Sequence, residues 1–121
     1  MSKKILVVDD DDLVLVAIRE LLTPLGFSVT ISPNGPDALE KVASHQFDLI
    51  ILDVIMPEMD GFEVCQRIRR IDSCTETPVM MLTAKSGDED RQRGLEMGAN
   101  LYLPKPISPK RLIALVEEAI Q

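Results

Sequence analysis

Short runs of consecutive apolar residues alternate with helical patterns along the chain, and this alternation limits the fold more than any other feature. Residues 5–8, 49–52 and 78–82 are continuous apolar runs, residues 27–31 alternate as a further strand, and residues 101–103 form a short one. A strand without polar alternation is buried on both faces, which occurs when helices cover both faces of a parallel sheet. We therefore expect an α/β fold with a doubly wound, five-stranded parallel sheet.

Helix signals fill the segments between these strands. The expected helices span residues 12–23, from 34 or 37 to about 44, from the end of a loop over 56–61 to about 71, from a cap at Ser86 to 98, and 109–121. Gly98 suits the left-handed position after a helix, and Ser108 followed by Pro109 is typical of a helix start. Crossovers between parallel strands are right-handed, and ligands of such sheets bind at the carboxyl ends of the strands.

Length and composition narrow the class of protein. The 121 residues suffice for one domain, and we expect a single domain over residues 1–121. Twenty acidic residues against 13 basic ones, with no Trp, one Tyr and three Phe, argue against a nucleic-acid partner. No apolar stretch approaches the ~18 residues of a membrane span. Two cysteines are too few for a disulfide framework. We expect a cytoplasmic protein.

Polar side chains stand at the carboxyl ends of four expected strands. Asp9 and Asp10 follow the first strand, Asp53 the third, Thr83 ends the fourth and Lys105 follows the fifth. Carboxylates packed together either raise a pKa or bind a cation. With no His or Cys nearby, oxygen ligands indicate Mg²⁺, Mn²⁺ or Ca²⁺, and few carboxylates with room for water favour Mg²⁺, with Mn²⁺ as the alternative. With a lysine and a threonine beside it, the set suits phosphoryl transfer to a carboxylate.

Each member of this set also has an ordinary explanation when it is taken alone. Residues 9–12 are four consecutive aspartates, which would form a solvated turn and a helix cap. Asp53 could cap a strand end, and Lys105-Pro106 could be a surface loop. The prediction therefore depends on the ordered combination at the strand ends.

Four segments resemble the signatures of the response regulator receiver domain of two-component signalling. They are residues 5–11 (ILVVDDD), 53–61 (DVIMPEMDG), 78–84 (PVMMLTA) and 102–106 (YLPKP). The resemblance extends from about Lys3 to Gln121. It implies a flavodoxin-like (βα)5 fold with the strand order 2-1-3-4-5.

The resemblance also implies a role for each site residue. Asp53 would accept a phosphoryl group from a phosphohistidine, or from a small donor such as acetyl phosphate. Asp10, Asp53 and the backbone carbonyl of Ile55 would ligate Mg²⁺, and Asp9 would act through a metal-bound water. Lys105 would contact the phosphoryl group.

Two further positions match the switch of the family. Thr83 would turn toward the phosphoryl group, and Tyr102 stands at the aromatic position that turns inward when Thr83 moves. Ile55 and Lys85 stand where the family flanks the path of attacking water. Because Ile55 has no polar group to orient a water, we expect slow self-dephosphorylation. Asp12 is expected to cap the first helix.

The helix over residues 12–23 is apolar all round. One face is shared by Val14, Ala17, Ile18 and Leu21. At ~100° per residue, this arrangement leaves Leu15 and Val16 pointing outward. They are either scattered surface residues or part of a docking patch for the helical bundle of a histidine kinase or a histidine phosphotransfer protein.

The expected function is a phosphorylation-driven switch that acts on a downstream effector protein or domain. The domain would catalyse its own phosphorylation without turning over an external substrate. A membrane partner is not expected, whereas a phosphorylation-dependent homodimer fits the resemblance. Two alternatives stay open. One is an aspartyl-phosphate phosphohydrolase, although Leu13 stands where such enzymes have Thr. The other is a pseudo-receiver that binds partners without being phosphorylated.

Overall fold

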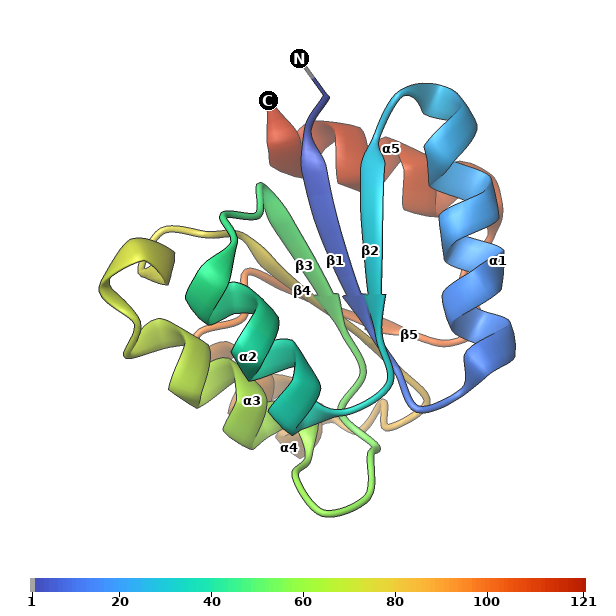
Figure 1. Cartoon of the computed structure of the whole chain (residues 1–121). Helices are drawn as coiled ribbons and strands as arrows, with labels where there is room; N and C mark the ends of the chain where they lie inside the picture. Colours follow the sequence, from blue (N-terminus) through green and yellow to red (C-terminus); the bar gives the residue numbers. More distant parts are fainter. Residues whose placement is uncertain (1) are drawn as a thin grey trace.

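A computed structural model describes residues 2–121, so Met1, the first residue of the expected domain, lies outside the described residues. Strands and helices alternate as the sequence predicts (Figure 1). The strands are β1 (Lys4–Val8), β2 (Ser28–Ser32), β3 (Leu49–Leu52), β4 (Val79–Thr83) and β5 (Leu101–Pro104). The helices are α1 (Asp12–Leu22), α2 (Gly35–Ser44), α3 (Gly61–Arg69), α4 (Asp88–Glu96) and α5 (Pro109–Ile120), with 3-10 turns η1 (Thr23–Leu25) and η2 (Asp72–Cys74).

The five strands form one parallel sheet in the order β2-β1-β3-β4-β5, which confirms the expected topology. Helices α1 and α5 cover one face, and α2, α3 and α4 cover the other (Figure 1). Val8, the last residue of β1, pairs with Ser32 of β2 and with Leu52 of β3. Strands β1, β2 and β3 therefore end level, β4 and β5 run two residues further, and the residues that follow the strands lie along one edge.

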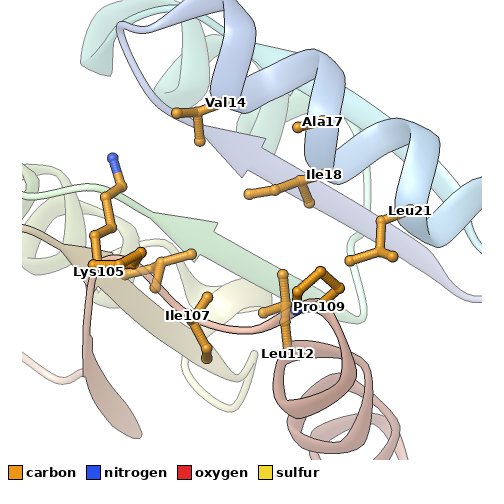
Figure 2. A pocket seen from close by; sticks show the side chains of 10 residues that line it. Val14, Ala17, Ile18, Leu21, Lys105, Ile107, Pro109 and Leu112 are labelled. Atoms are coloured by element: carbon orange, nitrogen blue, oxygen red, sulfur yellow. The ribbon is translucent and has the colours of Figure 1, made fainter.

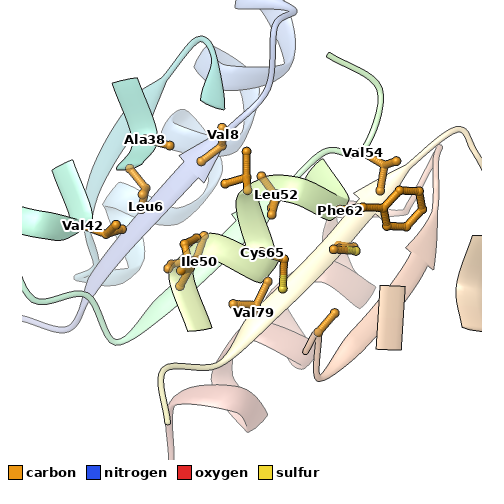
Figure 3. Packing of buried hydrophobic residues seen from close by; sticks show 14 of the residues in the cluster. Leu6, Val8, Ala38, Val42, Ile50, Leu52, Val54, Phe62, Cys65 and Val79 are labelled. Atoms are coloured by element: carbon orange, nitrogen blue, oxygen red, sulfur yellow. The ribbon is translucent and has the colours of Figure 1, made fainter. Parts of the chain in front are cut away.

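The continuous apolar runs are explained by two hydrophobic clusters, one on each face of the sheet. Alternate strand residues enter the cluster under α2, α3 and α4, among them Leu6 and Ile50, which Figure 3 shows. Met81 of β4 belongs to the same cluster. The neighbours of these strand residues, such as Val7 and Ile51, enter the cluster under α1 and α5. Both sides of the apolar runs in β1, β3 and β4 are thus removed from water, which explains why these runs lack polar alternation.

Several helix ends follow the expected signals. Asn34 and Ser108 cap α2 and α5 by accepting a hydrogen bond from the backbone N–H three residues later. Asp60 caps α3 in the same way, a role that was not expected from the sequence. Gly98 has φ 112°, as expected for the residue after a helix. Among residues 2–121, no helix is long and apolar enough to cross a membrane.

Two expected caps are wrong by one residue. Asp11 caps α1, because its Oδ1 accepts from the N–H of Leu13 at 2.9 Å, and Asp12 is the first helical residue. Gly87 is the N-cap of α4, and Ser86 lies in the preceding loop. In both places neighbouring residues have good capping chemistry, so the sequence alone leaves the start of the helix ambiguous.

The expected outward position of Leu15 is also wrong. Leu15 is 2% exposed and packs under α1 together with Ile18 and Leu22, whereas Val16 is 41% exposed as expected. The neighbouring Leu13 is 80% exposed. Because α1 is apolar on every side, periodicity does not fix its rotation. The contact with the sheet does.

Candidate functional site

Three carboxylates meet where β1 and β3 end. Carboxylate oxygens of Asp9, Asp10 and Asp53 all lie within 4.8 Å of one another. The backbone places two of them, since the N–H of Asp9 donates to Ser32 O of β2 at 3.1 Å and the N–H of Asp53 donates to Val8 O of β1 at 2.9 Å. Asp9 and Asp53 are buried and Asp10 is exposed. The cluster thus opens to solvent through Asp10.

Lys105 connects two of these carboxylates. Its Nζ lies 2.7 Å from Asp9 Oδ2 and 3.1 Å from Asp53 Oδ2. The backbone after β5 is fixed beside β4, because the Lys105 N–H donates to Thr83 O at 2.9 Å. The topology thereby joins residues that are 96 positions apart in the chain.

Burial and hydrogen bonds shift the pKa values of Asp9 and Lys105. Burial raises the pKa of Asp9, with Asp53 adding to the effect, and the hydrogen bonds from Lys105 and the Asp11 N–H only partly oppose it. Burial works to lower the pKa of Lys105, but hydrogen bonds to Asp9 and Asp53 outweigh this, and the net shift is upward. The ammonium therefore stays charged between the two carboxylates.

Backbone N–H groups orient the second oxygen of each buried carboxylate. Asp9 Oδ1 accepts from the Asp11 N–H at 2.9 Å, and Asp53 Oδ1 accepts from the Ile55 N–H at 3.2 Å. The first residue of α3, Gly61, packs directly on the Asp53 backbone, and a Cβ there would lie 2.7 Å from Val54 Cα. No side chain fits at Gly61, so this close approach of α3 fixes the Asp53 loop.

Thr83 and Tyr102 are linked through the backbone of one residue, Lys85, in the loop after β4. Thr83 is fully buried, and its Oγ1 accepts from the N–H of Lys85 at 3.2 Å. The Tyr102 hydroxyl donates to the carbonyl of Lys85, and the ring is 8% exposed. Burial, together with the charges of Asp90 and Asp53, raises the pKa of Tyr102 to about 12. The tyrosine thus has the inward orientation that the resemblance associates with the switch.

The donor set of the cluster fits a hard divalent cation. All three candidate ligands are carboxylates, and one of them faces solvent, where water can complete the coordination. Among the residues that the structure describes, this is the one group of three or more acidic, His or Cys side chains close enough to share an ion.

One structural residue, Arg69 at the end of α3, has no local signal in the sequence. Its guanidinium donates to the carbonyls of Gly98, Cys74 and Thr77 and to Asn100 Oδ1, at 2.6–3.1 Å. Arg69 thereby ties the α3–β4 and α4–β5 connections together. Its acceptors are mostly backbone carbonyls, which any residue provides, so the contact leaves no motif.

Comparisons with known proteins agree with this geometry. The family model of the response regulator receiver domain matches residues 5–117. The "Probable transcriptional regulator ycf29" of Porphyra purpurea is 41% identical over 120 residues, covering 99% of this chain and 57% of that protein. The alkaline phosphatase synthesis transcriptional regulatory protein PhoP of Bacillus subtilis is 40% identical over 121 residues, covering 100% and 50%. The chain thus spans about half the length of these relatives.

A solved structure matches over almost its whole length. The chemotaxis protein CheY4 of Vibrio cholerae superposes with a TM-score of 0.94 at 34% identity, covering 98% of this chain and 99% of that one. Together, the sheet order, the acidic edge and the matched family show that this chain belongs to the response regulator receiver domain family of two-component systems.

Proposed function

We propose that residues 1–121 act as one receiver domain in which Asp53 accepts a phosphoryl group from the phosphohistidine of a histidine kinase or phosphotransfer protein. The observation that carries this proposal is the contact of Lys105 Nζ with both Asp9 and Asp53 at the solvent-open edge of the sheet. A carboxylate that is oriented by a backbone N–H and adjacent to a fixed cation has the properties of a phosphoryl acceptor.

In the transfer, an oxygen of Asp53 attacks the phosphorus while the bond from phosphorus to the donor nitrogen breaks and its electron pair returns to the imidazole. Lys105 remains protonated and pairs with a phosphoryl oxygen once Asp53 has reacted. Thr83 offers a hydroxyl at the neighbouring strand end. No residue needs to donate a proton, because the leaving imidazole nitrogen takes one from solvent.

The carboxylates would hold Mg²⁺, which supplies positive charge against the phosphoryl oxygens when it is bound. Asp10, Asp53 and the backbone carbonyl of Ile55 are the proposed ligands, and Asp9 is proposed to act through a water. Mn²⁺ is the alternative ion. The exposed position of Asp10 leaves room for water ligands, which Mg²⁺ retains in most protein sites.

The proposed partner surface lies beside this site. Val16, Leu13 and Ala17 are exposed on α1, and a mostly apolar hollow of about 350 Å³ separates α1 from the start of α5 (Figure 2). The aliphatic stem of Lys105 lines this hollow, so a helix that docks there comes close to Asp53. A helical bundle that presents a phosphohistidine fits this surface. Leu15 is not part of it, since it is buried.

The proposed output is a change of surface around α4, β5 and α5. Thr83 and Tyr102 both contact the backbone of Lys85, Thr83 at its N–H and Tyr102 at its carbonyl. A turn of the Thr83 hydroxyl toward a phosphorylated Asp53 therefore removes the acceptor of the Lys85 N–H. Two relatives are named transcriptional regulators, so an effector that controls transcription is the proposed target. A phosphorylation-dependent homodimer through the same face is part of this proposal.

Labelling with acetyl phosphate tests the phosphoacceptor. We expect Mg²⁺-dependent addition of one phosphoryl group, detected by intact-protein mass spectrometry and lost in Asp53→Asn. Asp72→Asn is the matched control, because Asp72 is exposed and distant from the site in η2. Labelling that persists in Asp53→Asn would overturn the assignment. Absence of labelling in the wild type would instead favour a binding module, and repeated turnover of p-nitrophenyl phosphate a phosphohydrolase.

The lifetime of the phosphorylated state has its own test. The Ile55 side chain is 52% exposed and apolar, and the Lys85 ammonium lies 3.6 Å from Asp90 Oδ1, turned toward α4. Neither side chain is therefore placed to orient an attacking water, and we expect slow release of phosphate. Ile55→Asn should accelerate that release, and an unchanged rate would contradict the reasoning.

A further inference from the structure

Helix α4 packs on the molecule without burying a side chain of its own. Its sequence is DEDRQRGLE, and its one fully buried residue is Gly94, which has no side chain. A Cβ added at Gly94 would lie 2.6 Å from Tyr102 Cδ2, 3.0 Å from Tyr102 Cε2 and 2.9 Å from Met81 Sδ. Separations this short are below van der Waals contact, so the tyrosine ring lies directly against the helix backbone.

The conformation at Gly94 does not itself demand glycine. Gly94 is an ordinary helical residue, and the glycines with positive φ are Gly26 and Gly98. Alanine is the better helix former at such a position. The space that the Tyr102 ring and the end of the Met81 side chain occupy is therefore the reason that the structure offers for glycine here.

The same ring is fixed at its other end by the loop before α4. The Tyr102 hydroxyl donates to the carbonyl of Lys85, whose N–H donates to Thr83 Oγ1. The ring thus touches α4 through Gly94 and the end of β4 through Lys85. A displacement of the ring would release both contacts together.

We propose that Gly94 is a positioning residue for the switch, in that its bare backbone forms the seat that holds the Tyr102 ring inward and couples the ring to α4. The link to phosphorylation rests on the proposed function of Asp53, whereas the seat itself rests on the packing alone. A larger residue at this position displaces the ring toward solvent or lifts α4 from the sheet.

The single tyrosine and the absence of tryptophan make this proposal directly measurable. Intrinsic fluorescence reports on Tyr102 alone, and fluorotyrosine incorporation gives one fluorine NMR signal. In Gly94→Ala, the acrylamide quenching constant should rise toward that of free N-acetyltyrosinamide, and the fluorine shift should move toward that of the urea-unfolded chain. Gln92→Ala, an exposed site on the same helix, should leave both signals as in the wild type.

Unchanged signals in a folded Gly94→Ala variant would overturn the proposal. If that variant does not fold, Tyr102→Ala combined with Gly94→Ala decides the question. Removal of the ring should restore folding to that of Tyr102→Ala alone, whereas a double variant that stays unfolded would show that the ring is not what Gly94 accommodates.

A second experiment tests the contact of Gly94 with Tyr102 separately from the function of Asp53. Fluorotyrosine spectra are recorded with and without acetyl phosphate and Mg²⁺, and mass spectrometry follows the label. Phosphorylation should shift the Tyr102 signal in the wild type and shift it less in Gly94→Ala, whose ring is already displaced. Equal shifts in the two labelled proteins would refute the coupling. A wild type that takes no label would refute the phosphoacceptor role, while the comparison without donor still decides the seat.

Discussion

Leu15 and Val16 are neighbours on α1 with opposite environments, and substituting each by alanine separates stability from recognition. Leu15 is 2% exposed, so Leu15→Ala removes three buried carbons. At about 0.8 kcal/mol per carbon, with a further term for the cavity, we expect a loss of about 3 kcal/mol in the free energy of unfolding. For a chain of this length the melting temperature should fall by about 12 °C, at roughly 4 °C per kcal/mol.

Val16→Ala should behave differently. Its side chain is 41% exposed, and the higher helix propensity of alanine offsets part of the lost contact, so the change should stay within about 0.5 kcal/mol. Val16 lies on the proposed partner surface, however. Phosphotransfer from a cognate histidine donor should therefore slow in Val16→Ala, while labelling by acetyl phosphate proceeds at the wild-type rate.

Urea unfolding followed by circular dichroism measures the first effect, and phosphotransfer kinetics with both donors measure the second. Equal destabilisation by the two variants would refute the rotation of α1 described above. The phosphotransfer rates are compared at a temperature at which both variants are folded. Equal rates of transfer from the histidine donor to Leu15→Ala and Val16→Ala would refute the docking surface.

Other expectations concern the metal, the arginine and two weakly acidic groups. Mg²⁺ should raise the melting temperature of the wild type and raise it less in Asp10→Asn. Because Asp10 is exposed, the substitution itself should change the stability little. An equal response to Mg²⁺ would remove Asp10 from the proposed ligands. Arg69→Lys cannot reach four acceptors with one ammonium and should cost about 2–4 kcal/mol in urea unfolding, and a loss below about 1 kcal/mol would contradict its tethering role. Burial raises the pKa of the Cys65 thiol to about 11, so iodoacetamide at pH 8 should modify it only after unfolding; native labelling would show that α3 opens. Because Tyr102 ionises at about 12 when folded and at 10.0 when unfolded, its contribution to stability is present below pH 10 and is lost as the pH rises toward 12. A spectrophotometric titration of the native protein should place its midpoint above that of the denatured chain.

The strands and the edge of the site could be predicted because their signals are local or follow from topology. Apolar runs such as residues 49–52 have one compact solution in a parallel sheet, with helices on both faces. Once the strands are parallel, Asp9, Asp53 and Lys105 must meet at the same edge although they are far apart in the chain. The close contact of the three groups was therefore accessible from sequence.

The features that were missed depend on packing between distant segments. The rotation of α1 is decided by the sheet, since its sequence is apolar on all sides, and this is why Leu15 was misplaced. Arg69 binds carbonyls, which carry no residue signature. Gly94 is a single glycine in a polar helix, and its role appears only when the Tyr102 ring is beside it.

The sheet separates two apolar clusters that share no side chain, with α1 and α5 packed on one and α2, α3 and α4 packed on the other. Neighbouring strand residues such as Met80 and Met81 point into different clusters. Energetic effects of substitutions on the two sides should therefore add, because no contact is common to both. Substitutions packed under α4 can then alter that part of the output surface without disturbing the packing of the docking helix α1, while the carboxylates at the shared edge stay in place.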